Sequence, residues 1–215
     1  MLSMVSNITK MRLHILLMLA IDLAMVAMEW SVLSRAWKSD GAWMLRFYTQ
    51  SSNVLAMFVC AICAACEIFC LVRGCALPGW EQIIRYISTC CLMVTMIVAA
   101  CILVPMDKSN TFRSFMLEGG LLYLHTLCPI VMLAGCLIHG GAPLTVQHAL
   151  IAIIPTVIYG VVTLIMNAKR IYSGPYFFFR IHQQPWYMTV MWMCVIVGGN
   201  FVVSWLLGKL STLFR

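Results

Sequence analysis

A cluster of polar residues opens one of the long apolar stretches of the sequence. The segment FYTQSSN, residues 47–53, stands directly before VLAMFVCAICAACEIFC. On a helix that includes Thr49, the side chains of Ser52 and Asn53 follow three and four residues later and share its face. A hydroxyl and an amide on one face suit a nucleophile, Thr49, and an oxyanion donor, Asn53. The alternative is an N-terminal helix cap with interhelical hydrogen bonds, which the same residue types also provide.

A histidine inside another apolar stretch supplies the second chemical group. His125 lies in YLHTLCP, four residues before Pro129. Because a proline has no N–H to donate to the His125 carbonyl, we expect the helix to kink or loosen there. A neutral histidine is a suitable general base for a threonine hydroxyl near pH 7. A histidine also serves as an interhelical hydrogen-bonding partner for packing alone, and the spacing does not separate the two roles.

Four further ionisable residues lie inside apolar stretches: Asp22, Glu29, Glu67 and Arg85. Unpaired charges are costly in hydrocarbon, so such residues are candidates for function. Glu29 is expected near the end of the first helix, on the side of the candidate pair, where its carboxylate could orient the histidine as a third triad member. In the alternative hypothesis, Asp22, Glu29 and Glu67 line the polar path of a transporter or channel.

The elements that hold these residues are membrane-spanning helices. Of the 215 residues, 63% are hydrophobic and 10% are charged, whereas soluble domains carry about 25% charged residues. A spanning helix needs about 20 apolar residues. The sequence has six such segments, at 13–33, 50–72, 83–104, 119–139, 145–166 and 187–207. Their uniform apolarity excludes an outer-membrane barrel, whose strands alternate. We therefore predict an all-α polytopic membrane protein, with six transmembrane helices in one bundle that forms a single domain over residues 1–215.

The positive charge of the chain fits a membrane surface better than a nucleic acid. The formal net charge is +7, yet no basic run is longer than the pair Lys169-Arg170. Scattered lysines and arginines anchor helix ends among anionic headgroups. We expect membrane lipids as partners and no nucleic acid. Lysines and arginines are divided almost evenly between the two sides, which leaves the orientation open. The oligomeric state is open as well, because no feature of the sequence indicates it.

Alternation of six helices brings the candidate residues to one side of the membrane. The three long loops lie on that side, at 34–49, 105–118 and 167–186. Helices two, four and six start there, so Thr49, His125 and Tyr176 are expected in the same half of the bilayer. Pro175 and Tyr176 belong to the aromatic segment SGPYFFF, which suits the headgroup zone and the substrate side of a pocket. The loop at 105–118 has the pattern of a short interfacial helix, capped near Ser109.

Four cysteines have the spacing of a bacterial iron–sulfur ferredoxin motif, C-x2-C-x2-C-x3-C. They are Cys60, Cys63, Cys66 and Cys70. A cluster requires a loop that wraps around it, whereas these residues lie inside an apolar helical run and form one stripe. Small side chains of this kind allow helices to approach closely. We interpret the stripe as packing and predict no metal site and no cofactor.

Three segments carry a resemblance to a known family. FYTQSSNVLAMF, LHTLCPIVMLAGCLI and IPTVIYGVVTLIMNAKRIYSGPYFFF occur in this order. The set resembles the androgen-induced-gene-one and androgen-dependent-TFPI-regulating-protein family, and more closely its bacterial six-span relatives. The resemblance covers most of the chain as a pattern. It departs from the animal members at Ser51, Ser52 and Asn53, and at Gly174-Pro175-Tyr176, where an aliphatic residue usually precedes the proline.

The resemblance implies an intramembrane threonine hydrolase that cleaves fatty acid esters of hydroxy fatty acids or similar amphipathic lipid esters. The family's threonine falls on Thr49 as nucleophile, and its histidine falls on His125 as general base. Ser52, Asn53 and Glu29 would support the pair, without a metal or cofactor. The bacterial relatives imply a multi-pass protein of the bacterial cytoplasmic membrane. Two alternatives to the hydrolase remain: a transporter or channel, and a lipid acyltransferase.

Overall fold

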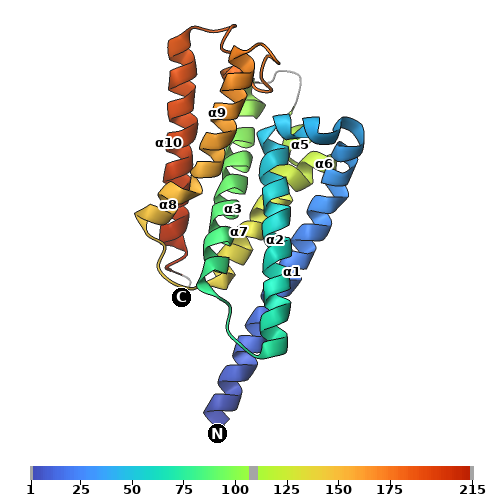
Figure 1. Cartoon of the computed structure of the whole chain (residues 1–215), viewed down its shortest axis with the longest axis vertical. Coiled ribbons are helices and arrows are strands. Elements are labelled where there is room, and N and C mark those ends of the chain that lie inside the picture. The colour runs from blue at the N-terminus through green and yellow to red at the C-terminus, as the bar shows by residue number, and fades with distance from the viewer. Residues whose placement is uncertain (1, 107–110, 214–215) are drawn as a thin grey trace.

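The computed structural model describes residues 2–106 and 111–213, with side chains from residue 6 onward. Six helices in this part of the chain are long and apolar enough to cross a membrane, and the described residues form no strand. The prediction of an all-α polytopic bundle is confirmed (Figure 1). The spans are Ser6–Arg46, Tyr48–Arg73, Gly79–Met106, Gly119–His139, Val146–Ala168 and Trp186–Leu210.

The first helix is longer than the predicted span. α1 covers Leu2–Asp40, which is 39 residues, because no proline or glycine interrupts that stretch. It ends before Gly41, whose φ of +55° lies in the left-handed region that glycine adopts without strain. The 3-10 turn η1, Gly41–Arg46, then leads into α2, Tyr48–Arg73. Figure 1 shows the N-terminal part of α1 extending beyond the other helices.

Three spans are irregular, each next to a proline. Pro105, Pro129 and Pro155 cannot donate to the carbonyl four residues earlier, and the helix loosens or breaks close to that carbonyl. The third span consists of α3 (Gly79–Val98), the π-helical turn η2 (Ala99–Leu103) and α4 (Val104–Met106). The fourth consists of α6 (Gly119–Leu122), the π-helical turn η3 (Tyr123–Leu127) and α7 (Cys128–His139). The fifth consists of α8 (Val146–Ala152) and α9 (Ile154–Ala168). The predicted loosening at His125 is confirmed, because His125 lies in η3.

Small side chains hold four helices together in the centre of the bundle. α1, α2, α3 and α7 contact one another, and α10, Trp186–Leu210, packs against α3 and α8. Cys60 and Cys63 of α2 are fully buried in a core cluster with Met25, Leu92 and Met132. α2 is an uninterrupted helix through the whole cysteine stripe, so the stripe packs against neighbouring helices and does not wrap a cluster.

The long connections gather at one end of the bundle, as the alternation of spans predicts (Figure 1). The short helix expected in the second long loop is α5, Phe112–Met116, whose cap is Thr111 in a capping box with Ser114. The predicted cap, Ser109, lies outside the described residues. In the third long loop the aromatic segment forms the 3-10 turn η4, Phe177–Phe179. This end therefore carries the start of α2, the α5 segment and the aromatic loop together.

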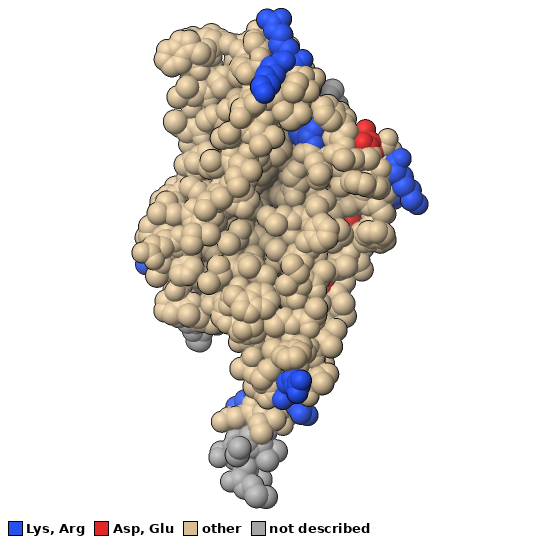
Figure 2. All heavy atoms as spheres, viewed as in Figure 1, with Lys and Arg blue, Asp and Glu red and all other residues tan. Residues whose placement is uncertain are grey.

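The surface has the charge distribution of a protein that sits in a bilayer. On the face shown in Figure 2, lysine and arginine lie mainly toward the two ends, and most of the surface between them carries no charge. Exposed leucine, isoleucine and valine side chains occur along most of the spans, for example Leu16, Ile62 and Val202. Lipid replaces water around such side chains.

A glycine in the connection between α7 and α8 provides a test of the fold. Gly141 has a φ of +104°, and a Cβ atom there would contact the side-chain amide of Gln82. That amide binds Ala142 twice, with Nε2 donating to its carbonyl at 2.8 Å and Oε1 accepting from its N–H at 2.9 Å. We predict that Gly141→Ala destabilises the protein by about 1–3 kcal/mol, because it strains the backbone and displaces Gln82. Thermal denaturation in detergent measures the effect.

The matched control is Gly198→Ala in α10, where a Cβ would meet no atom within 4 Å and the backbone is helical. This variant is expected to keep or slightly raise the melting temperature, since alanine favours helix more than glycine does. Equal melting temperatures for the two variants would contradict the predicted effect of backbone strain and Gln82 displacement at Gly141.

Candidate functional site

The structure brings Thr49 and His125 into direct contact. Thr49 Oγ1 lies 3.2 Å from Nε2 of His125, and both residues are buried. Thr49 stands in the first turn of α2, and His125 stands in the π-helical turn η3. The two residues are 76 positions apart in the sequence, so only the packing of η3 against α2 makes this contact.

The other ring nitrogen of His125 determines the direction of the Thr49–His125 hydrogen bond. Nδ1 lies 2.9 Å from the carbonyl oxygen of Phe115, and a carbonyl can only accept, so Nδ1 carries the proton. In the neutral ring, Nε2 then has a free lone pair and accepts from the Thr49 hydroxyl. This tautomer is the one that a general base for Thr49 requires.

The helix α5 holds η3 by three contacts, two of which are with the imidazole of His125. The first contact is the hydrogen bond from Nδ1 to the Phe115 carbonyl. In the second, the phenyl ring of Phe115 stacks on the imidazole of His125, with centroids 4.9 Å apart and an angle of 20° between the planes. Next to it, Thr126 donates to the carbonyl of Met116 at 2.7 Å. Two consecutive residues of η3 thus bind two consecutive carbonyls at the end of α5. Sequence reasoning missed Phe115, since a main-chain carbonyl leaves no signature in the sequence.

Glu29 does not orient His125, contrary to the expectation from its position in the first helix. Phe115 occupies the ring nitrogen that Glu29 would need, and neither carboxyl oxygen of Glu29 has a hydrogen-bond partner among the described residues. The side chain is fully buried and lies beside the thiol of Cys128. Helix position predicted the correct end of the bundle for Glu29, but it did not predict which neighbour the side chain faces.

Asn53 and Ser52 hold the main chain around Thr49 in place. Nδ2 of Asn53 donates to the carbonyls of Thr49, at 2.6 Å, and of Leu124, at 3.3 Å. Ser52 lies 2.7 Å from the hydroxyl of Thr95 and donates to the Thr49 carbonyl at 3.1 Å. Because both amide hydrogens of Asn53 are used, Asn53 links α2 to η3 and has no free donor for an oxyanion. The start of α2 has no side-chain cap, so these residues do not act as the N-terminal cap that the sequence also allowed.

Thr49 lies between two cavities. The first, of about 240 Å³, is almost entirely apolar and lies between α2, α3, α9 and α10. Val94, Val157 and Ile196 are among its lining residues. The second, of about 600 Å³, is more polar and lies next to His125, Gln50 and Arg180. Thr49, Leu103 and Tyr176 line both cavities, so Thr49 lies where the two spaces adjoin.

Tyr176 places a second hydroxyl beside Thr49. Burial raises the pKa of the Tyr176 phenol, and the nearby polar groups of Thr49 and of the Tyr48 main chain only partly offset this. The phenol therefore stays protonated at neutral pH and keeps an O–H to donate. Its ring stacks on Phe178 at 5.1 Å. Pro175, the other predicted loop residue, lines the second cavity. Sequence reasoning placed Tyr176 on the correct side but did not predict its contact with Thr49.

A polar link beside the first cavity joins α9 and α10 to the start of α2. The hydroxyl of Tyr48 lies 2.6 Å from that of Thr156 on α9, and Asn200 on α10 donates to the same Thr156 oxygen at 2.7 Å. Because Tyr48 and Thr49 are adjacent, α9 and α10 are connected directly to the turn that carries the candidate nucleophile. No sequence motif indicated this link.

The remaining intramembrane charges form a separate cluster. Asp22 and Glu67 both bind the guanidinium of Arg85. Glu67 follows Thr49 by 18 residues on α2, which corresponds to roughly 27 Å along the helix axis. Among the described residues, one group of His, Cys, Asp and Glu side chains is spaced closely enough for a metal ion, Asp22, Cys63 and Glu81, and it belongs to this distant cluster.

Comparisons with known proteins give no match for this chain among family models, curated proteins or solved structures. The site is therefore interpreted from its own geometry.

The contact between Asn53 and η3 can be tested by its effect on stability. We predict that Asn53→Ala lowers the free energy of unfolding by about 1–3 kcal/mol, because the buried Leu124 carbonyl loses a hydrogen-bond donor. Asn53→Asp is expected to be worse, since a carboxylate would face two carbonyl oxygens. Thermal denaturation measures both. The control is Ser51→Ala, which removes one exposed hydrogen bond to the Leu45 carbonyl. An Asn53→Ala protein as stable as the Ser51→Ala protein would show that the link to η3 is not needed.

Proposed function

We propose that this protein is an intramembrane threonine hydrolase that cleaves a lipid ester, such as a fatty acid ester of a hydroxy fatty acid, in the bacterial cytoplasmic membrane. The observation that carries the proposal is the hydrogen bond from Thr49 to Nε2 of His125, with Nδ1 held by the Phe115 carbonyl. A buried hydroxyl beside a base in the correct tautomer is the arrangement that nucleophilic catalysis needs. The resemblance of the three sequence segments to the six-span hydrolase family supports the same reaction.

The mechanism has two steps that use the same two groups. His125 Nε2 takes the Thr49 proton while Thr49 Oγ1 attacks the ester carbonyl, and the tetrahedral intermediate then expels the alcohol, which receives that proton from His125. In the second step, His125 takes a proton from water, and the hydroxide attacks the acyl-threonine. Collapse of this intermediate releases the fatty acid and returns the proton to Thr49.

The oxyanion of each intermediate needs a donor, and Tyr176 is the group we assign to it. Its hydroxyl lies beside Thr49, it is protonated at neutral pH, and it lines both cavities. A donor already in place when charge develops on the carbonyl oxygen lowers the barrier without reorganisation. We assign Tyr176 as the oxyanion donor in place of Asn53, the donor expected from the sequence, because the amide hydrogens of Asn53 already bind carbonyls.

The two cavities divide the substrate at the scissile bond. The apolar cavity suits the acyl chain of the ester, which needs no polar partner along its length. The more polar cavity next to His125 suits the alcohol part of the ester and, after its release, the attacking water. Thr49 stands at the junction, where the ester carbonyl would lie.

The nucleophile can be tested with a fluorophosphonate probe. We predict that purified wild-type protein is labelled and that Thr49→Val, which keeps the shape of the side chain but lacks the hydroxyl, is not. His125→Gln is expected to reduce the labelling rate by about 10²–10⁴-fold, the usual contribution of a general base. Thr49→Ser is the matched control and should retain labelling. Labelling that persists unchanged in Thr49→Val would disprove the assignment of the nucleophile.

The oxyanion donor can be tested separately. We predict that Tyr176→Phe lowers kcat by about 10²–10³-fold, as the loss of one oxyanion donor does in other acyl-transfer enzymes, and changes KM little. A chromogenic ester assay measures both constants. Tyr172→Phe is the control, because Tyr172 contacts Trp43 and lines neither cavity at Thr49. A change in KM alone would instead indicate that Tyr176 only binds substrate.

A lipid acyltransferase is the second candidate function, and the size of the polar cavity supports it. A space of about 600 Å³ next to His125 is large enough for an acceptor alcohol in place of a single water molecule. The acyl-threonine and the role of His125 would be the same, and the acceptor hydroxyl would replace water in the second step. Product analysis with and without an added lipid alcohol separates a free fatty acid from a transferred acyl group.

A further inference from the structure

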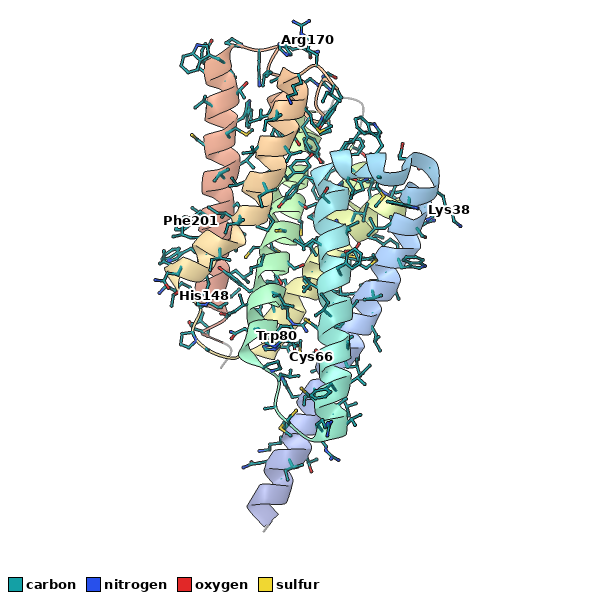
Figure 3. All side chains as sticks on the ribbon, viewed as in Figure 1. Lys38, Cys66, Trp80, His148, Arg170 and Phe201 are labelled. Carbon is teal, nitrogen blue, oxygen red and sulfur yellow. The ribbon has the colours of Figure 1, made fainter. Side chains whose placement is uncertain are left out.

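A second polar centre lies in the half of the bundle that is remote from Thr49. Arg85 of α3 is fully buried and binds Asp22 of α1 twice, at 2.6 Å and 2.7 Å. The same guanidinium donates through Nη2 to Glu67 of α2 and to Glu81 of α3, each at 3.1 Å. In Figure 3, Cys66 and Trp80, the neighbours of Glu67 and Glu81, lie toward the opposite end from Lys38 and Arg170. We call these four side chains the Arg85 cluster.

The charges of the Arg85 cluster do not balance. Three carboxyl groups surround one guanidinium, and the side chains of all four residues are at most 1% exposed. The other titratable groups that face them are His14 of α1, Cys60, Cys63 and Cys66 of α2, and Cys136 and His139 of α7. With every carboxyl ionised and both histidines neutral, the cluster would carry two uncompensated negative charges inside a membrane protein, which is strongly unfavourable.

His139 provides independent evidence for a bound proton. Its Nδ1 lies 3.2 Å from the carbonyl of Gly140 and must donate to it, which leaves Nε2 with a lone pair in the neutral ring. Among the described residues Nε2 has no hydrogen-bond partner, and it lies 3.5 Å from Glu81 Oε1 in a side chain that is 6% exposed. A lone pair facing a carboxylate is repulsive, so this arrangement favours a proton between the two atoms.

Glu67 provides a position for another proton. The Glu67 and Glu81 carboxyls both bind the same nitrogen of Arg85, each at 3.1 Å, which brings the two groups close together. One oxygen of each, Oε2, has no partner among the described residues. Two ionised carboxylates in such contact repel, whereas a protonated Glu67 donates to Glu81 and removes one charge.

A metal ion would be the other way to balance the charge. Ligand atoms of Asp22, Cys63 and Glu81 lie within 4.8 Å of one another, a spacing that a cation could use. Both oxygens of Asp22, however, already face nitrogens of Arg85, so a metal at this position would lie against the guanidinium. Protons neutralise the excess charge without displacing Arg85.

We propose that the Arg85 cluster is a proton-binding site. It holds one proton on Glu67, donated toward Glu81, and a second on Nε2 of His139, donated to Glu81. The remaining charges then pair: Arg85 with Asp22, and His139 with Glu81. Exchange with water takes place at the membrane surface opposite Thr49, past His139, His14 and the connection at Gly140-Gly141. His14 is half-buried and stands edge-on to His139, with ring centroids 6.2 Å apart.

Infrared difference spectroscopy of the purified full-length protein tests this proposal. Between acidic and alkaline buffer, the wild type should show carboxylic-acid C=O bands, one of which disappears in Glu67→Gln. His139→Gln should move the titration midpoint of that band by about one pH unit, a tenfold change in proton affinity. Glu118→Gln is the matched control, because Glu118 is exposed and paired with Arg113. Glu29→Gln identifies the band of the other buried carboxyl.

Two results would overturn the proposal. The first is a Glu67→Gln spectrum identical to that of the wild type. The second is about one divalent metal ion per chain, found by elemental analysis and lost in Cys63→Ala. Glu67→Gln is expected to fold, since glutamine has the shape of a protonated glutamate, whereas Asp22→Asn should lower the melting temperature strongly. Should Glu67→Gln fail to fold, a wild-type spectrum without any C=O band beyond that of Glu29 decides against the site.

Discussion

The hydrogen bond from His125 Nδ1 to the Phe115 carbonyl is the interaction on which the candidate site depends. It determines the tautomer, and the tautomer determines which atom can accept the Thr49 proton. A carbonyl differs from the carboxylate that occupies this position in a serine-protease triad, because it orients the ring without placing a negative charge beside it. In a bundle surrounded by lipid, a neutral acceptor avoids the cost of burying another ion. The price of this arrangement is a base that receives less stabilisation once it becomes an imidazolium.

The sequence predicted the parts of the structure that depend on length and polarity. Six apolar runs of about 20 residues can only be six helices in a bilayer, and their alternation brings Thr49, His125 and Tyr176 to one end. The loosened turn at His125 followed from Pro129, which cannot donate a hydrogen bond. These inferences required no knowledge of how the helices rotate about their axes.

The details that the sequence did not predict depend on such rotation and on the main chain. Glu29 was expected beside His125 because both residues lie near the same end of the bundle. Its side chain faces Cys128 instead. Asn53 was expected to face substrate, but both of its amide hydrogens bind carbonyls. The role of the Phe115 carbonyl could not be predicted, because every residue has a main-chain carbonyl and the sequence does not show which one accepts a hydrogen bond. Side-chain direction across helices is determined by packing, which a single sequence does not reveal.

The absence of a side-chain cap at the start of α2 has an electrostatic consequence. The aligned peptide dipoles of a helix place roughly half a positive elementary charge at its first turn. α2 is 26 residues long, and Thr49 is the second of them. Negative charge that develops at the Thr49 oxygen, or on a carbonyl oxygen bound to it, lies in the favourable field of the helix that carries it. The main chain of α2 thus provides a positive electrostatic potential near the membrane surface, without the need for an ionisable side chain.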